Sequence, residues 1–163
     1  MKKIILVRHA KSSWDDPFLN DHDRPLAERG IADAPIMAKR LKKKGIVSDL
    51  ILSSTALRAA ETARTTAKIL GYPAEQIHWE KGLFHASPNQ ILKIIRMQND
   101  AANTILVFGH NPGFNDLIIY LGGDLDNLPT SGQFGFKLKT DHWAELKPET
   151  VEVWFFDYPK KKS

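Results

Sequence analysis

The pattern of apolar and polar positions along the chain alternates between short apolar runs and stretches with helical periodicity. The expected strands are residues 3–8, 49–53, 76–79 and 104–109. The expected helices are residues 27–44, 56–70, 88–98 and a segment from about Pro112 to Gly122. Repeated alternation of this kind predicts a mostly parallel sheet with helices on both faces, which is a three-layer α/β/α domain.

The last third of the chain has a different pattern. Residues 133–139 and 151–157 alternate between apolar and polar positions, as half-exposed strands do. Two such strands in succession predict an antiparallel edge to the sheet. Residues 10–26, in contrast, are polar and show no period. A loop of that length usually has a function or is mobile.

Composition agrees with one globular domain, because the chain has 163 residues, of which 42% are hydrophobic and 26% charged. We expect residues 1–158 to form this domain and residues 159–163 to be a basic tail. A membrane-spanning helix would need about 18 or more consecutive apolar residues, and the chain has no such run. The first residues lack the features of a secretory signal, and cysteine is absent. These features predict a cytoplasmic protein without a membrane partner.

The net charge of +4 comes largely from two lysine clusters, at residues 42–44 and 160–162. The first cluster falls at the end of an expected helix, where cations are favourable, and the second lies in the tail. Aromatic residues do not alternate with these lysines in the manner of nucleic-acid motifs. We therefore interpret the clusters as a solvated helix end and a solubilising tail, and expect no nucleic-acid partner.

The candidate chemistry lies at the carboxyl ends of the expected strands. Arg8 and His9 end the first strand, Arg58 comes one turn after the second, and His110 and Asn111 follow the strand at 104–109. The carboxyl ends of parallel strands meet at one edge of a sheet, and ligands bind there. We therefore expect two arginines and two histidines to converge.

Such a constellation suits a tetrahedral anion. Guanidinium groups bind two oxygens at once and keep their charge, so Arg8 and Arg58 can hold a dianion from two sides. The helix after Pro112 would add free N–H groups and its positive dipole end. A neutral histidine can attack phosphorus, and a protonated second histidine can stabilise the transferring oxygens. Spacing alone favours a phosphate or carboxylate site, while a single histidine at a strand end would more often be structural.

Three blocks of sequence resemble the histidine phosphatase superfamily, which has the phosphoglycerate-mutase-like fold. Residues 4–10 resemble its N-terminal signature, with Arg-His-Ala in place of the usual Arg-His-Gly. Residues 53–63 resemble the second block, and residues 109–112 resemble the block with the second histidine. The resemblance extends in order from residue 4 to about residue 158.

Further blocks resemble the small SixA-like phosphohistidine phosphatases more closely. These blocks are residues 8–12, 23–26, 29–30 and 83–88. The resemblance implies that His9 is the nucleophile and forms a phosphohistidine intermediate, which water then hydrolyses. The residues that it places around the phosphoryl oxygens are Arg8, Arg58, His110 and the backbone of Asn111. No metal and no cofactor is implied.

One position departs from the mutases and from many phosphomonoesterases of the superfamily. In those proteins a Glu soon after a Leu protonates the leaving oxygen, whereas here His85 follows Leu83, and Glu80 precedes it. Phosphohistidine can leave as neutral imidazole and needs no strong acid. The departure favours a protein phosphohistidine as substrate. With His85 or Asp23 as the acid, a small-molecule phosphomonoesterase remains the alternative, and a non-catalytic phosphate-binding module is the second alternative.

The remaining expectations concern the neighbours of this site. The 10–26 loop should form one wall of a shallow pocket, because the chain has little room for a lid. The candidate phosphate contacts in this loop are Lys11, Ser12 and Ser13, of which Lys11 can equally be a solvated lysine. We expect Trp14 to pack in the interior, with a place on the rim as the alternative. Glu61, one turn after Arg58, should orient it by an ion pair.

Overall fold

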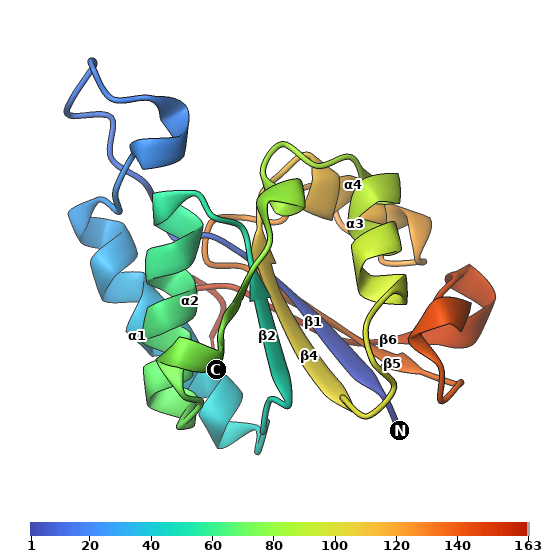
Figure 1. The fold of residues 1–163 in the computed structure, drawn as a ribbon. Coiled ribbons are helices and arrows are strands. Elements are labelled where there is room, and N and C mark those ends of the chain that lie inside the picture. The colour runs from blue at the N-terminus through green and yellow to red at the C-terminus, as the bar shows by residue number, and fades with distance from the viewer. Residues whose placement is uncertain (163) are drawn as a thin grey trace.

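Six strands form one mixed sheet at the centre of the protein in the computed structural model, which describes residues 1–162 (Figure 1). The strands are β1 (Lys3–Arg8), β2 (Leu50–Ser53), β3 (His78–Trp79), β4 (Thr104–Gly109), β5 (Gln133–Leu138) and β6 (Val151–Asp157). Their order is β3-β2-β4-β1-β5-β6. The first four of these are mutually parallel, and β5 runs antiparallel to both β1 and β6. The predicted parallel sheet with an antiparallel edge is confirmed.

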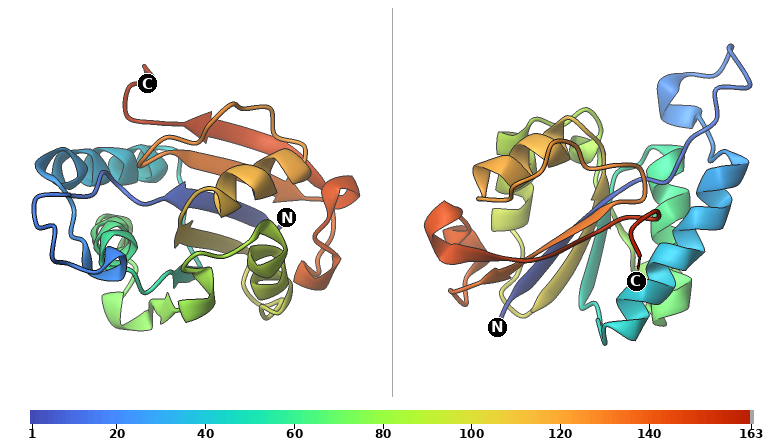
Figure 2. Two further views of the ribbon diagram at one scale, coloured as in Figure 1. Left: turned by 90° about the horizontal axis from the view of Figure 1, so that it is seen from above. Right: turned by 180° about the vertical axis from the view of Figure 1, so that it is seen from behind.

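Helices cover both faces of this sheet. The α-helices are α1 (Glu28–Lys43), α2 (Leu57–Leu70), α3 (Pro88–Arg96) and α4 (Gly113–Tyr120). Short 3-10 turns occur at η1 (Asp21–Asp23), η2 (Ala74–Gln76), η3 (Lys81–Leu83), η4 (Trp143–Glu145) and η5 (Pro148–Thr150). Figure 2 shows α1 and α2 on one side of the sheet and α3 and α4 on the other. The predicted three-layer α/β/α architecture is confirmed.

The two faces of β1 illustrate why its sequence is a continuous apolar run. Alternate residues of a strand point to opposite faces. Ile4 and Leu6 therefore pack in the core beneath α3 and α4, whereas Ile5 and Val7 pack in the core beneath α1 and α2. All four side chains are at most 2% exposed. Burial on both faces fixes the carboxyl end of β1, where the candidate residues begin.

The 10–26 loop returns to its starting point. Ser12 forms an isolated antiparallel bridge with Leu26, and the amide of Ala27 donates to the carbonyl of Lys11 at 2.9 Å. Gly30 of α1 permits this closure, because a Cβ there would lie 2.2 Å from the Lys11 carbonyl oxygen. Between its tied ends, the loop projects beyond the ends of α1 and α2 (Figure 1).

Several boundaries differ from the expected ones. The strand expected at residues 76–79 is only two residues long, and α4 ends at Tyr120 rather than at Gly122. Arg40 donates to the carbonyl oxygens of Tyr158 and Pro159, so the chain stays attached to α1 beyond residue 158. The division into residues 1–158 and a tail at 159–163 stays a prediction, and Ser163 lies outside the described residues.

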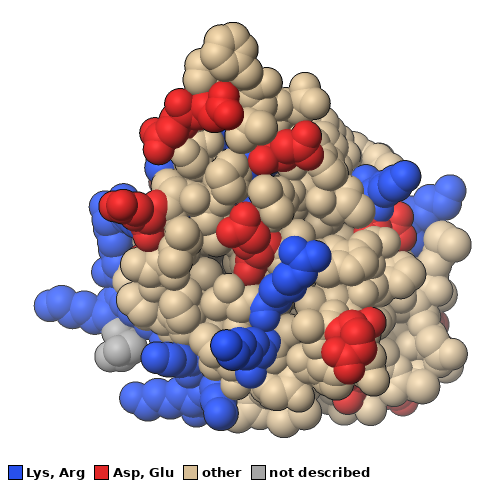
Figure 3. Space-filling model, turned by 60° about the vertical axis from the view of Figure 1, so that its left-hand side comes forward, with Lys and Arg blue, Asp and Glu red and all other residues tan. Residues whose placement is uncertain are grey.

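The two lysine clusters lie side by side on the surface. One pocket is lined by Lys43 and Lys44 from the end of α1 together with Lys161 and Lys162 from the tail. On the face drawn in Figure 3, Lys and Arg side chains gather at the lower left and acidic side chains toward the top. Within residues 1–162, no helix is both long and apolar enough to cross a membrane.

Candidate active site

A cleft of about 320 Å³ lies beside the carboxyl ends of β1 and β4. The residues that line it are Arg8, His9, Lys11, Ser12, Trp14, Asp21, Arg24, Arg58, His85, His110, Asn111 and Thr130. Two features of the fold bring the expected residues together. The register of β1 and β4 pairs Arg8 with Gly109, the residue before His110. The neighbouring strand β2 leads into α2, which carries Arg58.

His9 is held on the floor of the cleft as a neutral imidazole. It is 7% exposed, and its Nδ1 atom lies 2.8 Å from the carbonyl oxygen of Ala10. Burial lowers the pKa of His9 to about 3, and the positive charges of Arg58, Arg8 and Arg24 act in the same direction, against the hydrogen bond to Ala10. A neutral ring beside a carbonyl oxygen donates its Nδ1 hydrogen, so Nε2 keeps its lone pair. That lone pair is available for nucleophilic attack at neutral pH.

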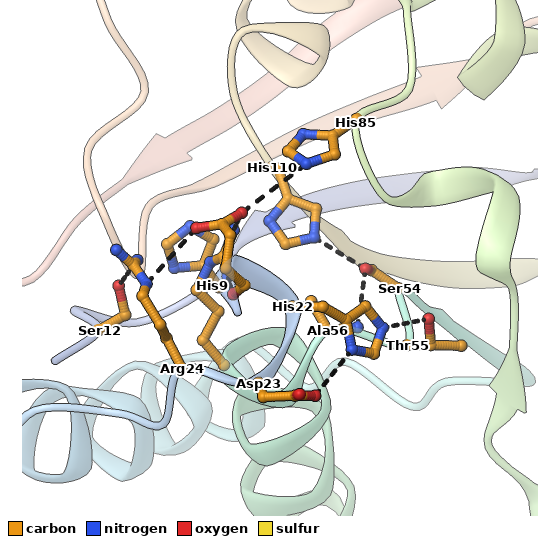
Figure 4. Close-up of polar contacts among 12 residues, drawn as sticks. His9, Ser12, His22, Asp23, Arg24, Ser54, Thr55, Ala56, His85 and His110 are labelled. Atoms are coloured by element: carbon orange, nitrogen blue, oxygen red, sulfur yellow. Dashed lines mark hydrogen bonds and ion pairs between the residues drawn. The ribbon is translucent and has the colours of Figure 1, made fainter. Parts of the chain in front are cut away.

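The ring of His110 lies next to His9, with 5.2 Å between the ring centroids (Figure 4). Burial lowers the pKa of His110 to about 2, and His9, Arg58, His85 and Arg8 lower it further. The structure therefore has a neutral His110 where we expected a protonated one. A dianion among the same cations would raise this pKa, because its charge offsets theirs. Protonation of His110 would then accompany binding.

A hydrogen bond to Ser54 sets the direction of the His110 ring. Nε2 of His110 lies 2.8 Å from the Ser54 hydroxyl, which also accepts the amide hydrogen of Ala56 at 3.2 Å. The hydroxyl hydrogen is then free to be donated to Nε2. Nδ1 of His110 carries the ring hydrogen in that arrangement, and it is buried with no partner among the described residues. His110 can thus donate a hydrogen bond to an oxyanion even while it is neutral.

The arginines make only part of their possible hydrogen bonds with the protein. Nη1 of Arg8 donates to the carbonyl of Leu128 at 3.0 Å. Arg58 donates from Nη1 to the carbonyl oxygen of Asp21 at 2.6 Å and from Nη2 to its carboxylate at 3.1 Å. Burial and the neighbouring Arg58 lower the pKa of Arg8. Positive charge is therefore concentrated here beyond what nearby carboxylates neutralise.

Unpaired donors identify the kind of ligand that the cleft would bind. Seven buried side-chain nitrogen or oxygen atoms have no hydrogen-bond partner among the described residues. Five of them belong to residues of the cleft, and these are Arg8 Nε, Arg24 Nε and Nη1, Arg58 Nε and His110 Nδ1. Leaving a buried donor unpaired costs about 1–3 kcal/mol. A ligand with several acceptor oxygens, such as a phosphoryl group, would satisfy these donors together.

Comparisons with known proteins agree with this chemistry. Residues 4–83 match the family model of the histidine phosphatase superfamily, branch 1. An uncharacterized protein of Mycobacterium tuberculosis is 33% identical over 165 residues, which cover 94% of this chain and 100% of that protein. The chain belongs to the histidine phosphatase superfamily.

Within the superfamily, the structure of this histidine phosphatase is similar to those of SixA proteins. A SixA structure from Agrobacterium tumefaciens, provisionally described as a phosphohistidine phosphatase, has a TM-score of 0.82 and 27% identity and covers 97% of this chain and 98% of its own. A 2,3-bisphosphoglycerate-dependent phosphoglycerate mutase of Gloeothece citriformis is 42% identical over 65 residues, which are 39% of this chain and 28% of the mutase. The expected phosphoglycerate-mutase-like fold and the SixA-like resemblance are confirmed, and the protein is a phosphatase.

Arg24 is one of the cleft residues that the sequence did not predict, and Asp21 is another. Nη2 of Arg24 donates to the hydroxyl of Ser12, which lines the cleft and whose role as a phosphate contact stays a prediction. The guanidinium lies 3.3 Å from the ring centroid of Trp14. Trp14 is 73% exposed, so its expected place in the interior is wrong and the rim alternative holds. The bridge between Ser12 and Leu26 places Arg24 beside residues 11–13, and the local sequence pattern carries no signal for it.

The first turn of α4 offers fewer free N–H groups to a ligand than we expected. The side chain of Asn111 accepts the amide hydrogen of Asn115 at 3.1 Å and donates to the carbonyl of Leu128 at 2.9 Å. The amide of Phe114 donates to the carbonyl of His110 at 3.0 Å. These N–H groups are therefore already paired within the turn. Asn111 still lines the cleft, and its role as a backbone helper stays a prediction.

The two candidate acids lie in different places. His85 lines the mouth of the cleft, with its Nε2 3.7 Å from the Asp21 carboxylate. The Asp23 carboxylate instead lies 3.3 Å from Nδ1 of His22 and is not among the residues that line the cleft (Figure 4). Of the two, the structure brings only His85 to the site.

Two further expectations about neighbouring residues differ from the structure. Glu61 forms no ion pair with Arg58, which pairs with Asp21 instead. Burial raises the pKa of Glu61, opposed by Arg64 and by the backbone of Leu26. Ser13 lines a neighbouring groove rather than the cleft. Among residues 1–162, no three His, Asp or Glu side chains are grouped so that they could hold a metal ion.

Proposed function

We propose that this protein is a metal-independent phosphatase that acts through a phosphohistidine intermediate on His9, with phosphohistidine on a protein as its preferred substrate. The observation that carries the proposal is the neutral His9, buried among unpaired donors of Arg8, Arg24, Arg58 and His110. A nucleophile and an oxyanion site in one cleft are the two requirements of phosphoryl transfer. Binding alone would not need the oriented lone pair of His9.

The first step transfers the phosphoryl group to the enzyme. The Nε2 lone pair of His9 attacks phosphorus in line, and the bond from phosphorus to the leaving nitrogen or oxygen breaks with its electron pair. Arg8, Arg24 and Arg58 hold the equatorial oxygens in place of a metal ion. His110 donates the hydrogen on its Nδ1 to one of these oxygens.

The second step is hydrolysis of the intermediate. The Nδ1 hydrogen of His9 stays on the ring, because the Ala10 carbonyl accepts it. When water attacks phosphorus, the P–N electron pair returns to Nε2 and His9 leaves as a neutral imidazole. One proton of the water passes to the phosphate product or to solvent. No acid is needed to release His9.

The mouth of the cleft favours a protein substrate with an imidazole leaving group. His85 is the group at the position of the usual Glu, and its side chain is 70% exposed. The neighbouring loop carries Phe18, which is 93% exposed, and Trp14, and both are free to contact a large partner. We place the enzyme in the cytoplasm because it has no cysteine. We expect neither nucleic acid nor membrane as a partner.

A small-molecule phosphomonoesterase is the second candidate. The observation that favours it is the position of His85, which can reach a leaving oxygen if it is protonated. Its Nε2 lies 3.7 Å from the Asp21 carboxylate, at the mouth of the cleft.

The test compares a phosphohistidine-bearing protein with p-nitrophenyl phosphate, in excess chelator, for wild type and His9→Ala. We expect the wild type to hydrolyse both, the phosphoprotein much faster, and the variant to lose on the order of 10³-fold or more. Hydrolysis of the ester alone would overturn the proposal that phosphohistidine is the preferred substrate, and would favour small phosphomonoesters. Phosphate binding without any turnover would overturn the catalytic proposal, and loss of turnover in chelator would overturn metal independence.

A further inference from the structure

Asp21 is the single acidic side chain that lines the cleft within the described part of the chain. Its Oδ2 accepts from Nη2 of Arg58 at 3.1 Å and lies 3.7 Å from Nε2 of His85. Its Oδ1 lies 3.5 Å from Nε of Arg24. A carboxylate in this position is unexpected in a site for a dianion, because it repels the anion that the arginines attract. It therefore calls for a role other than phosphate binding.

Burial places Asp21 at the mouth of the cleft. Its side chain is 43% exposed and that of His85 is 70% exposed, whereas His9 is 7% exposed. In-line transfer puts the leaving group on the side of phosphorus opposite the attacking Nε2 of His9. With His9 on the floor, the leaving group must face the mouth. Asp21 and His85 are therefore among the cleft residues on that side, together with the exposed Lys11 and Trp14.

We infer that Asp21 forms the leaving-group subsite and selects substrates whose leaving group presents an N–H to it. This inference rests on the proposed function. The imidazole of a phosphohistidine has a second ring nitrogen that can carry a hydrogen, and the Asp21 carboxylate accepts it. A phosphate ester with an anionic leaving group, such as a hydroxy acid, offers no such hydrogen and is repelled.

The hydrogen bond also assists the chemistry. The carboxylate stabilises the protonated ring of the substrate, so a larger fraction of it is protonated at neutral pH. When His9 Nε2 forms its bond to phosphorus, the P–N bond of the substrate breaks and its electron pair goes to the substrate nitrogen. The proton stays on the second nitrogen, so the product is a neutral imidazole. His9 acquires the phosphoryl group with its own Nδ1 hydrogen retained, and the donor and acceptor rings are then equivalent.

A purely positioning role for Asp21 makes a different prediction. If Asp21 only held Arg58, its loss would weaken every substrate alike. Asp21→Asn separates the two roles, because the amide oxygen can still accept from Arg58 while the charge is removed. The groups that face Asp21 are Arg24 from the loop, Arg58 from α2 and His85 from the segment before α3. The first two stay charged throughout the neutral range.

The experiment measures kcat and KM for a phosphohistidine-bearing protein and for p-nitrophenyl phosphate, and the inhibition constant of inorganic phosphate. The variants are Asp21→Asn, Asp21→Glu and the matched control Asp15→Asn, which removes the same charge from the same loop but outside the cleft. For Asp21→Asn we expect the phosphohistidine kcat to fall roughly tenfold or more, since a charge-assisted hydrogen bond is lost. Its KM for the ester and its phosphate inhibition constant should fall about threefold to tenfold, since one repelling charge is gone.

A second variant and a pH profile test the same inference, and the second variant does so even if Asp21→Asn is unstable. Asp21→Glu should regain much of the phosphohistidine kcat. In Asp21→Asn, the alkaline decline of phosphohistidine turnover should move to lower pH by about one unit, because the carboxylate no longer favours the protonated ring. Equal loss on both substrates, or no change beyond that of Asp15→Asn, would overturn the inference. If the wild type hydrolyses the ester but not the phosphoprotein, the proposed substrate is wrong. That result is obtained before any Asp21 variant is compared, so it is distinct from failure of the inference about Asp21.

Discussion

Nδ1 of His9 lies 2.8 Å from the carbonyl oxygen of Ala10, its own neighbour in the chain. The contact keeps the ring hydrogen on the far side from the phosphoryl site. The Ala10 backbone is itself fixed, because its amide donates to the hydroxyl of Thr62 at 3.0 Å. That hydroxyl donates in turn to the carbonyl of Arg58 at 2.8 Å. One buried threonine thus links the nucleophile to an arginine of the oxyanion site.

We therefore expect Thr62→Val to impair both stability and catalysis. Thr62 is 1% exposed, so the Ala10 amide would lose its partner in the interior. The free energy of unfolding should fall by about 1–2 kcal/mol, the usual cost of such a loss. Urea denaturation and kcat measure the two effects, and Thr62→Ser serves as the control that keeps the hydroxyl. A kcat equal to wild type would show that the Ala10 carbonyl needs no such support.

The low pKa values of the two histidines predict acid sensitivity. His9 and His110 have folded-state pKa values of about 3 and about 2, below the ordinary value of 6.5. The unfolded chain therefore binds more protons below pH 6.5, and stability falls as pH decreases through that range. Between pH 7 and pH 5 each histidine should remove about 2 kcal/mol from the free energy of unfolding.

Urea denaturation at the two pH values tests this, with His110→Gln expected to lose about half of the difference. A histidine NMR titration with midpoints near 6.5 for both rings would contradict it. Inorganic phosphate should raise both pKa values, because its charge offsets that of the arginines.

Arg24 should be a phosphoryl ligand of the same rank as Arg8 and Arg58. Two of its nitrogens are buried without hydrogen-bond partners among the described residues. We expect Arg24→Gln to raise KM for p-nitrophenyl phosphate by roughly 10- to 100-fold, the effect of losing a charged hydrogen bond. Arg29→Gln is the matched control, since Arg29 lies exposed on α1 beside Asp33. Equal KM values for the two variants would remove Arg24 from the site.

Phe18 should matter for protein substrates alone. It is 93% exposed on the loop that borders the cleft. Phe18→Ser should lower kcat/KM for a phosphohistidine-bearing protein roughly threefold to tenfold, as for an apolar contact at an interface, and leave p-nitrophenyl phosphate hydrolysis unchanged. Val47→Ser is a suitable control, because Val47 is 75% exposed before β2, at the other end of the sheet. An equal loss of kcat/KM for p-nitrophenyl phosphate would indicate that Phe18 supports the structure of the loop instead.

Periodicity predicted the residues that strands position, and it could not predict those that the loop positions. His9 and His110 follow from the rule that parallel strands present their carboxyl ends together. Asp21 and Arg24 lie in an aperiodic segment whose path depends on tertiary contacts, such as the bridge between Ser12 and Leu26. Local spacing was therefore a poor guide there.

Two expectations were wrong because they concern contacts between residues that are distant in sequence. Glu61 has suitable helical spacing for an ion pair with Arg58, but Asp21, distant in sequence, takes that place. Trp14 was expected in the interior, but the Arg24 guanidinium, from the other end of the loop, stacks on its ring, and the residue is 73% exposed.

The central position of β4 has a consequence for the order of folding. β4 lies between β1 and β2, although it is synthesised after both. The pairing of Arg8 with Gly109 joins segments that are far apart in sequence, and such pairings form slowly. His9 and Arg58 therefore have no common scaffold until β4 has been made and inserted between their strands. A growing chain on the ribosome would acquire its phosphoryl site only after His110 has emerged, so hydrolytic activity reports the insertion of β4 into the sheet.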